Sequence, residues 1–210
     1  MYTLYYSPGT TSLAVHWMLI ELGVPHELKK LDLEAGEHRT AEYLRLNPNG
    51  LVPTLIVDGA PLYESAALLM LLAERHPQAG FAPQVGHPQR GAYLTWMFHL
   101  SNTLQTAFGD WFHPEQVAGP GAVDAVKEGA RQRIESAWDR IDAQIRSGGP
   151  YVTGDRVGAV DFLATMLMRW SRNMPKPATE WAMIANYVAR MKSRPSFKTL
   201  YTREGLTEWA

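Results

Sequence analysis

The stretch NPNGLVPTLIVDGAPLYES, residues 47–65, decides the fold. Two apolar runs, Thr54–Val57 and Pro61–Tyr63, flank the dipeptide Asp58-Gly59. Asp-Gly between two apolar runs is the strongest short-range signal of a β-hairpin, because both central residues of its turn need a positive φ. The stretch therefore predicts an antiparallel pair of strands.

The residues that flank the hairpin predict its start and the element after it. Pro53 cannot donate to a strand ladder and restricts Val52, so this pair marks a strand entry or a turn, whose peptide bond can be cis or trans. Glu64 and Ser65 precede the apolar run Ala66–Ala73. They predict a helix N-terminus, where a carboxylate and a hydroxyl lie beside unpaired backbone N–H groups.

Composition narrows the class of protein. The chain has 210 residues, 46% hydrophobic and 20% charged, as expected for one large or two small globular domains. Its formal net charge of −1 gives no general attraction to nucleic acids or acidic membranes. The absence of cysteine excludes disulfides, thiolate metal ligands and protein-thiol redox chemistry.

Several other classes are excluded by missing motifs. The first 30 residues lack a signal-peptide pattern, and no window is long and apolar enough for a membrane span. The histidines show no metal-ligand spacing, and neither a P-loop nor a G-x-S-x-G motif occurs. We therefore expect a cytoplasmic protein without a metal, a membrane or a nucleic-acid partner.

The N-terminal third alternates strand and helix patterns. Gly23 and Pro25 end the first helix, and the hairpin makes the sheet mixed. The predicted order is βαβαββα, with the first two strands parallel through a right-handed crossover. Before and after the hairpin strands, the predicted elements are a strand at Tyr2–Tyr6, a helix at Leu13–Leu22, a strand at His26–Leu33, a helix at Thr40–Leu46 and a helix at Ala66–Glu74.

After residue 77 the strand patterns end. A Pro- and Gly-rich linker at 78–88 separates a domain at 1–77 from an all-helical domain at 89–210. Helices are predicted at Tyr93–Phe112, over a segment in which Ile134, Trp138, Ile141 and Ile145 recur until Gly148, from Gly158 or Ala159 to Arg172, at Thr179–Lys192 and at Pro195–Tyr201.

Four motifs resemble those of cytosolic glutathione S-transferases: YYSPGTTSLAVHWMLIELGVP (5–25), NPNGLVPTL (47–55), YESAALLMLLAERHP (63–77) and YVTGDRVGAVDFLAT (151–165). They occur in the family's order and span the chain. The resemblance implies a thioredoxin-like α/β N-terminal domain with a mixed sheet, joined to an all-α helical-bundle C-terminal domain. It also implies glutathione as co-substrate, no metal, and a homodimer.

The chain departs from this family at two positions. Its start is most similar to bacterial beta-type enzymes, in which a cysteine follows the first strand, but Thr11 stands there. The mixed-disulfide and reductase chemistry of that type is therefore not expected. Gly158 stands where the family usually has Ser or Thr, three residues before a buried Asp, here Asp161. Because glycine is an acceptable N-cap, we expect the helix to form with a loss of only a few tenths of a kcal/mol.

The resemblance implies residues for the peptide part of glutathione. The Val52 backbone would pair with the cysteinyl amide like an added strand, at an edge that Pro53 fixes. Glu64 would accept from the ligand ammonium, while Ser65 and the helix N-terminus would donate to the γ-glutamyl carboxylate. The alternative is a loop end and an ordinary helix cap. Candidates for the glycyl carboxylate are His38, Arg39 and Asn49, although any one of them, taken alone, fits a surface polar residue better.

The thiol needs donors, because its ordinary pKa is about 8.5 and only a few per cent is thiolate at pH 7. The residues between the first strand and the first helix offer five hydroxyls, one of which is expected simply to cap the helix. Alignment to the family ranks Thr11 and Ser12 first, then Ser7, then Tyr6, with Thr10 as a further contact to glutathione.

The electrophile needs an apolar wall. Aromatic residues that can supply it, although most such residues belong to a core, are Trp96, Phe98, Phe108, Trp111, Phe112 and Trp170. Gln105 is a polar candidate in the region where beta-type enzymes commonly have a histidine. We predict a glutathione transferase that detoxifies small hydrophobic electrophiles. The alternatives are a noncatalytic glutathione-fold binding protein, or a glutathione-dependent isomerase, dehalogenase or peroxidase.

Overall fold

The computed structural model describes residues 1–119 and 121–209. Contacts divide the chain into two compact units, one of Met1–Gln84 with the residues from Lys192 onward, the other of Val85–Met191. The sequence-based division differs at the C-terminal end, because it assigned residues 192–209 to the helical domain. The last helix instead packs in the first unit, against the first helix of the chain.

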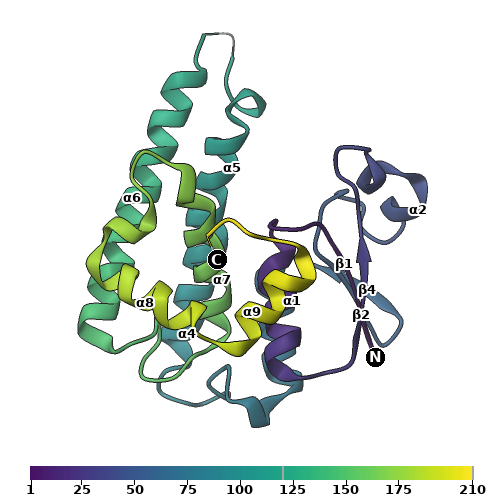
Figure 1. Ribbon diagram of the computed structural model, residues 1–210, viewed down its shortest axis with the longest axis horizontal. Coiled ribbons are helices and arrows are strands. Elements are labelled where there is room, and N and C mark those ends of the chain that lie inside the picture. The colour runs from purple at the N-terminus through teal and green to yellow at the C-terminus, as the bar shows by residue number, and fades with distance from the viewer. Residues whose placement is uncertain (120, 210) are drawn as a thin grey trace. The chain divides into compact units, whose positions relative to one another are not determined.

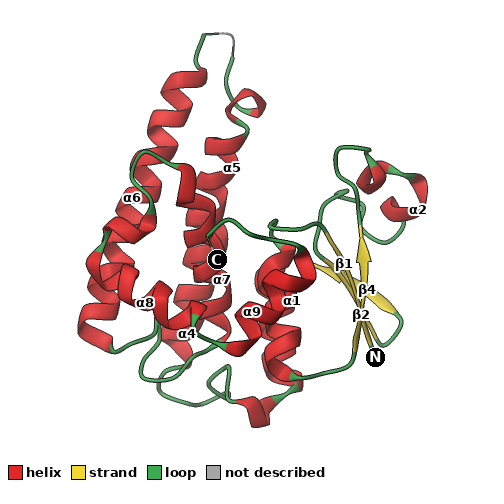
Figure 2. Cartoon of the chain, in the orientation of Figure 1, coloured by secondary structure: helices red, strands yellow, loops and turns green. Residues whose placement is uncertain are grey.

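The first unit holds a mixed four-stranded sheet with the order β2-β1-β3-β4 (yellow in Figure 2). β1 (Tyr2–Tyr6) runs parallel to β2 (His26–Lys30) and antiparallel to β3 (Thr54–Val57), which pairs with β4 (Ala60–Tyr63). The hairpin prediction is confirmed, and the φ values of Asp58 and Gly59, 52° and 84°, are those of a turn with two left-handed residues.

β2 ends three residues before the predicted Leu33. The Asp32 carboxylate accepts the N–H groups of Glu34 and Ala35, at 3.0 and 2.9 Å. A side chain that bonds its own backbone two and three residues further on makes a turn and competes with the strand ladder. The apolar spacing of Leu31 and Leu33 could not reveal this competition.

Helices cover both faces of the sheet. Side chains alternate along β1, so Leu4 and Tyr6 face α1 (Ser12–Leu22), while Tyr5 packs on the opposite face with Tyr43 of α2 (Ala41–Leu44). α3 (Ser65–Arg75) and α9 (Pro195–Glu204) both pack against α1, and Figure 1 shows α1 and α9 side by side. Trp17 of α1 is fully buried there.

The second unit is helical. A long helix was predicted at Tyr93–Phe112, and the structure has a continuous run of α4 (Arg90–Phe98), a π-helical segment (His99–Gln105) and α5 (Thr106–Phe112). α6 (Val123–Gly148) packs along α5 and buries Ile134, Trp138, Ile141 and Ile145. The remaining helices are α7 (Ala159–Trp170) and α8 (Ala182–Lys192), and no helix in the described residues is long and apolar enough to cross a membrane.

Asp161 organises the start of α7. Its fully buried carboxylate accepts the N–H groups of Val152 and Gly158, at 3.0 and 2.7 Å, and the Tyr187 hydroxyl at 3.0 Å. The helix begins at Ala159, directly after the predicted N-cap Gly158. Glycine has no side chain to return the bond, so Asp161 closes only one half of a capping box.

Candidate functional site

The loop between β1 and α1 uses two of its hydroxyls internally. Thr10 Oγ1 and Ser12 Oγ donate to the Ser7 carbonyl, at 2.7 and 3.0 Å, and lie 2.9 Å from each other. Ser12 is fully buried. Because each hydroxyl has one proton, these two residues serve the loop in this conformation.

Thr11 joins the loop to the hairpin stretch. Its Oγ1 donates to the Val52 carbonyl at 2.5 Å, and it makes no side-chain cap to α1 although it occupies the N-cap position. The structure therefore brings together the predicted thiol-binding loop and the predicted peptide-binding backbone. The same bond occupies the one proton of Thr11.

Two predicted donors keep their hydroxyls unpaired among the described residues: Ser7 Oγ and the Tyr6 hydroxyl form no hydrogen bond there. Ser7 is half-buried and Tyr6 is buried. Burial raises the pKa of Tyr6, and the Glu204 carboxylate raises it further. Tyr6 is thus a neutral O–H donor around neutral pH.

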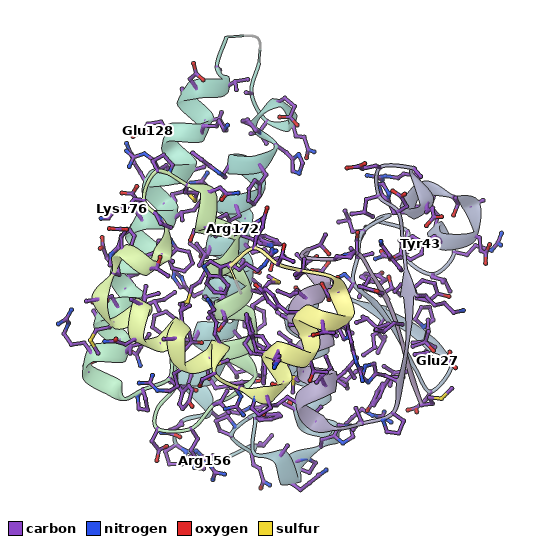
Figure 3. The ribbon with its side chains drawn as sticks, in the orientation of Figure 1. Glu27, Tyr43, Glu128, Arg156, Arg172 and Lys176 are labelled. Atoms are coloured by element: carbon purple, nitrogen blue, oxygen red, sulfur yellow. The ribbon has the colours of Figure 1, made fainter. Side chains whose placement is uncertain are left out.

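The Val52–Pro53 peptide bond is cis. The carbonyl of Leu51, the residue before Val52, accepts hydrogen bonds from the Tyr43 hydroxyl at 2.5 Å and from Asn47 Nδ2 at 2.8 Å (Tyr43 is labelled in Figure 3). These two bonds hold the turn in place. The Val52 N–H donates no hydrogen bond to any other described residue. A fixed backbone with a free donor next to a carbonyl is the requirement for pairing with an extended peptide.

The pairing of β3 with β4 places the start of α3 near Val52. Thr54 pairs with Tyr63, so Glu64 and Ser65 follow directly opposite the turn at Pro53. Glu64 is exposed, has a φ of 72° and does not cap α3. Ser65 Oγ has no hydrogen-bond partner among the described residues. The first amides of α3 are thus uncapped by side chains, and a non-glycine residue with positive φ stands beside them.

The three candidates for the glycyl carboxylate come from one region. Arg39 Nη1 lies 3.4 Å from the Asn49 carbonyl, and the Arg39 side chain crosses Gly50. A Cβ on Gly50, whose φ is 59°, would lie 2.9 Å from the His38 carbonyl oxygen. Glycine is therefore required for the close approach of these two segments.

Phe108 and Trp170, two residues of the predicted electrophile wall, belong to an aromatic cluster of the helical unit that includes the exposed Phe112. Trp170 meets Phe108 and Phe112 edge to face, with ring centroids 5.7 and 5.9 Å apart. Trp111 lies instead under the Lys127 ammonium, 5.0 Å from its ring centroid. Gln105 ends the π-helical segment, and its buried Oε1 has no hydrogen-bond partner among the described residues.

One cavity of the first unit is separate from these residues. It has a volume of about 270 Å³ and lies on the α2 face of the sheet. None of the residues predicted to contact glutathione lines it; its walls are Tyr5, Leu31, Glu37, Thr40, Glu42, Tyr43 and Leu46.

Sequence reasoning missed Glu204 altogether. Its carboxylate accepts the Gly9 N–H at 2.9 Å and contacts His16 Nδ1 at 2.8 Å. Glu204 lies 195 positions from Gly9 and 188 positions from His16, and no local sequence signal links residues so far apart. No group of three or more metal-ligating side chains occurs within residues 1–119 and 121–209.

Comparisons with known proteins agree with this architecture. Residues 10–75 match the family model for the glutathione S-transferase N-terminal domain. A curated glutathione S-transferase of Xanthomonas campestris pv. campestris, GST-4.5, is 28% identical over 97% of this chain and 98% of its own length.

Solved structures extend the likeness over the whole fold. A glutathione transferase from Methylococcus capsulatus is 30% identical, with a TM-score of 0.88 over 99% of this chain and 100% of that one. A sphingomonad glutathione S-transferase complexed with glutathione is 26% identical, with a TM-score of 0.84 over 98% and 100% of the two chains. The chain therefore belongs to the glutathione S-transferase family.

Proposed function

We propose that this chain binds glutathione, holds its thiol as thiolate and transfers that thiol to a small apolar electrophile. The observation that carries the proposal is the Val52 peptide. Its N–H is unpaired, its carbonyl is held by Thr11, and the uncapped start of α3 follows opposite it in the strand register. The glutathione bound to the sphingomonad relative supports the choice of ligand.

The peptide part of glutathione would occupy this edge of the first unit. The Val52 N–H and the second lone pair of its carbonyl would pair with the cysteinyl amide. Ser65 Oγ and the first amides of α3 would donate to the γ-glutamyl carboxylate, and the exposed Glu64 would accept from the ammonium. Arg39, with His38 and Asn49 beside it, would receive the glycyl carboxylate.

The thiol would lie at the N-terminal end of α1. Ser7 is now the preferred donor, because the protons of Thr10, Thr11 and Ser12 are given to carbonyls in this conformation. Tyr6, kept neutral by its raised pKa, is the second candidate, although it is buried. The helix N-terminus adds its positive end, and both effects favour the charged form of sulfur.

The proposed reaction needs a thiolate and an apolar wall for its electrophile. The sulfur would form a bond to an electrophilic carbon, and the leaving group would depart with the electrons of the bond that breaks. The proton lost from the thiol would pass to solvent. Phe108, Trp111 and Trp170, with Gln105 as acceptor, would line the side of the electrophile.

Assembly and location are part of the proposal. The apolar residues Ala67, Met70 and Leu71 of α3 remain partly exposed, and so do Leu62 and Tyr63 of β4, at 38% and 39%. This exposed apolar surface supports a homodimer, because a second copy of the chain would cover it. We propose a cytoplasmic detoxification role, with no nucleic-acid or membrane partner.

The test is glutathione affinity by calorimetry together with steady-state conjugation of a generic aryl halide. In Ser7→Ala, we expect kcat to fall about ten- to a hundredfold, because a hydrogen bond to a charged group is worth about 1.5–3 kcal/mol. Unchanged kinetics in Ser7→Ala would move the role of donor to Tyr6.

The same measurements distinguish the transferase from a noncatalytic binding protein. Two observations favour this second candidate: the hydroxyls of Thr10, Thr11 and Ser12 donate to backbone carbonyls, and the chain has no cysteine. Tight binding of glutathione without turnover across a panel of electrophiles would support it. If glutathione does not bind at all, both functions are refuted.

A further inference from the structure

Glu204 is a buried carboxylate that the proposed reaction does not use. It lies at the end of α9, and its side chain, like that of His16 on α1, is 0% exposed. Oε1 contacts His16 Nδ1 at 2.8 Å, and Oε2 accepts the Gly9 N–H at 2.9 Å. Each carboxylate oxygen therefore has a partner on a different segment, one on a helix and one in the thiol-binding loop.

His16 donates to Glu204 rather than accepting from it, because a carboxylate has no proton to give when ionised. Its other ring nitrogen, Nε2, is buried without a hydrogen-bond partner in the described part of the chain. A proton on Nε2 would leave a buried N–H unsatisfied, so a proton on Nδ1 fits the hydrogen bonds of the site. His16 thus orients the carboxylate towards Gly9.

A buried carboxylate is a costly way to join two helices. Desolvation of a charge costs several kcal/mol, and an apolar side chain of similar volume seals an interface as well or better. The bond to Gly9 gives this charge a function beyond packing. Gly9 has a φ of 71° and sits midway between Ser7 and Thr11, whose hydroxyl is tied to Val52.

We propose that Glu204, oriented by His16, is a positioning residue that fixes the thiol-binding loop Ser7–Ser12 through the Gly9 N–H. The inference rests on the proposed function. Thr11 anchors one end of the loop to Val52, and Glu204 anchors its middle to α9. Catalytic donors must be held to a fraction of an ångström, and a shift of about 1 Å can cost about a hundredfold in rate.

The competing explanation is that Glu204 only holds α9 against α1. The same two helices offer a matched control, because Glu21 of α1 pairs with Arg194 and accepts from Ser196 at the other end of their contact. Glu21 contacts no residue of Ser7–Ser12 in any of these bonds. A purely structural role predicts equal consequences at Glu204 and Glu21.

The experiment compares Glu204→Met, Glu204→Gln and Glu21→Met in the full chain. We measure unfolding, kcat and KM for glutathione, and the pH midpoint of the bound thiolate from its ultraviolet absorbance. In Glu204→Met we expect kcat to fall roughly ten- to a hundredfold and the thiolate midpoint to rise, because the loop donors are no longer held in place. In Glu204→Gln, whose amide oxygen can still accept from Gly9, kcat should recover to within about threefold.

Amide hydrogen exchange of Gly9 in the free protein gives a readout that needs no activity. Exchange should be faster in Glu204→Met than in the wild type, and unchanged in Glu21→Met. If Glu204→Met does not fold, Glu204→Asp replaces it, because aspartate keeps the carboxylate but is shorter by one methylene and holds it further from Gly9. We expect the same fall in kcat, rise in the thiolate midpoint and faster Gly9 exchange in Glu204→Asp.

Two results would overturn the inference. The first is that Glu204→Met keeps the wild-type values of the thiolate pH midpoint, of kcat and of the Gly9 exchange rate. The second is that Glu21→Met changes these quantities as much as Glu204→Met does. A wild-type protein that neither binds glutathione nor turns over refutes the proposed function instead, and the Gly9 exchange then still tests the tether.

Discussion

Ser65→Ala tests the proposed contact between α3 and the γ-glutamyl carboxylate. Ser65 Oγ has no hydrogen-bond partner among the described residues, and the residue is 4% exposed at the first position of α3. Removing this oxygen breaks no bond within the protein, and alanine is the best helix former. The unfolding free energy should therefore stay within about 0.5 kcal/mol of the wild type.

The binding of glutathione should change much more. A hydrogen bond to a charged group contributes about 1.5–3 kcal/mol net, and about 1.4 kcal/mol corresponds to a factor of ten in affinity. We expect the dissociation constant of glutathione to rise about ten- to a hundredfold. Because the γ-glutamyl group lies far from the reacting sulfur, the loss should appear in KM and leave kcat nearly unchanged.

Calorimetry with two ligands makes the assay specific. Glutathione is compared with an analogue that lacks the α-carboxylate of the γ-glutamyl group, and both are titrated into wild type, Ser65→Ala and Ser147→Ala. The last is a control, because the Ser147 hydroxyl bonds only to carbonyls of its own exposed helix turn. The wild type and Ser65→Ala should bind the analogue equally. Equal affinity of these two proteins for intact glutathione, or an equal loss for both ligands, would refute the reasoning.

Three further predictions concern the scaffold of the site. Gly50→Ala should destabilise the protein by about 1–2 kcal/mol or more in urea unfolding, because alanine at a φ of 59° is strained and its Cβ would meet the His38 carbonyl at 2.9 Å; an unchanged midpoint would contradict the close approach. Asp161→Ala leaves the buried N–H groups of Val152 and Gly158 without their acceptor and should cost on the order of 3 kcal/mol in guanidinium unfolding, with Asp161→Asn recovering part of it; a loss below about 1 kcal/mol would count against the network. Burial lowers the pKa of His26, so its contribution to stability is complete above about pH 6.5 and is lost as the pH falls through the window below; His26→Gln should flatten the pH dependence of the unfolding free energy in that window, and an unaltered slope would exclude this origin.

The secondary structure follows from local chemistry wherever one residue type dominates the choice. Asp58-Gly59 specifies a turn that few other dipeptides can adopt, and Gly23 supplies the left-handed residue that ends α1. These elements begin and end within a residue or two of their predicted bounds. β2 ended early because Asp32 captured the backbone beyond it, an outcome that apolar spacing does not encode.

The candidate site divides in the same way. Val52 and Ser65 could be proposed from adjacent motifs, because a turn proline and a helix start act through the backbone of their own segment. The fate of the Thr11 proton could not, since it depends on a carbonyl 41 positions away, and the same holds for the contact from Glu204 to Gly9, 195 positions away. A ranking of candidate thiolate donors by alignment is therefore least reliable where tertiary contacts decide which hydroxyl proton is free.

The packing of α9 against α1 also bears on how the chain folds during synthesis. Residues 1–84 leave the ribosome first, but the helix that covers Trp17 of α1 comes after Val85–Met191, a segment of about a hundred residues. At about 5–20 residues per second, this segment takes on the order of 5–20 s to make. The first unit is thus begun first and completed last, and the apolar surface of α1 stays uncovered by α9 throughout that interval.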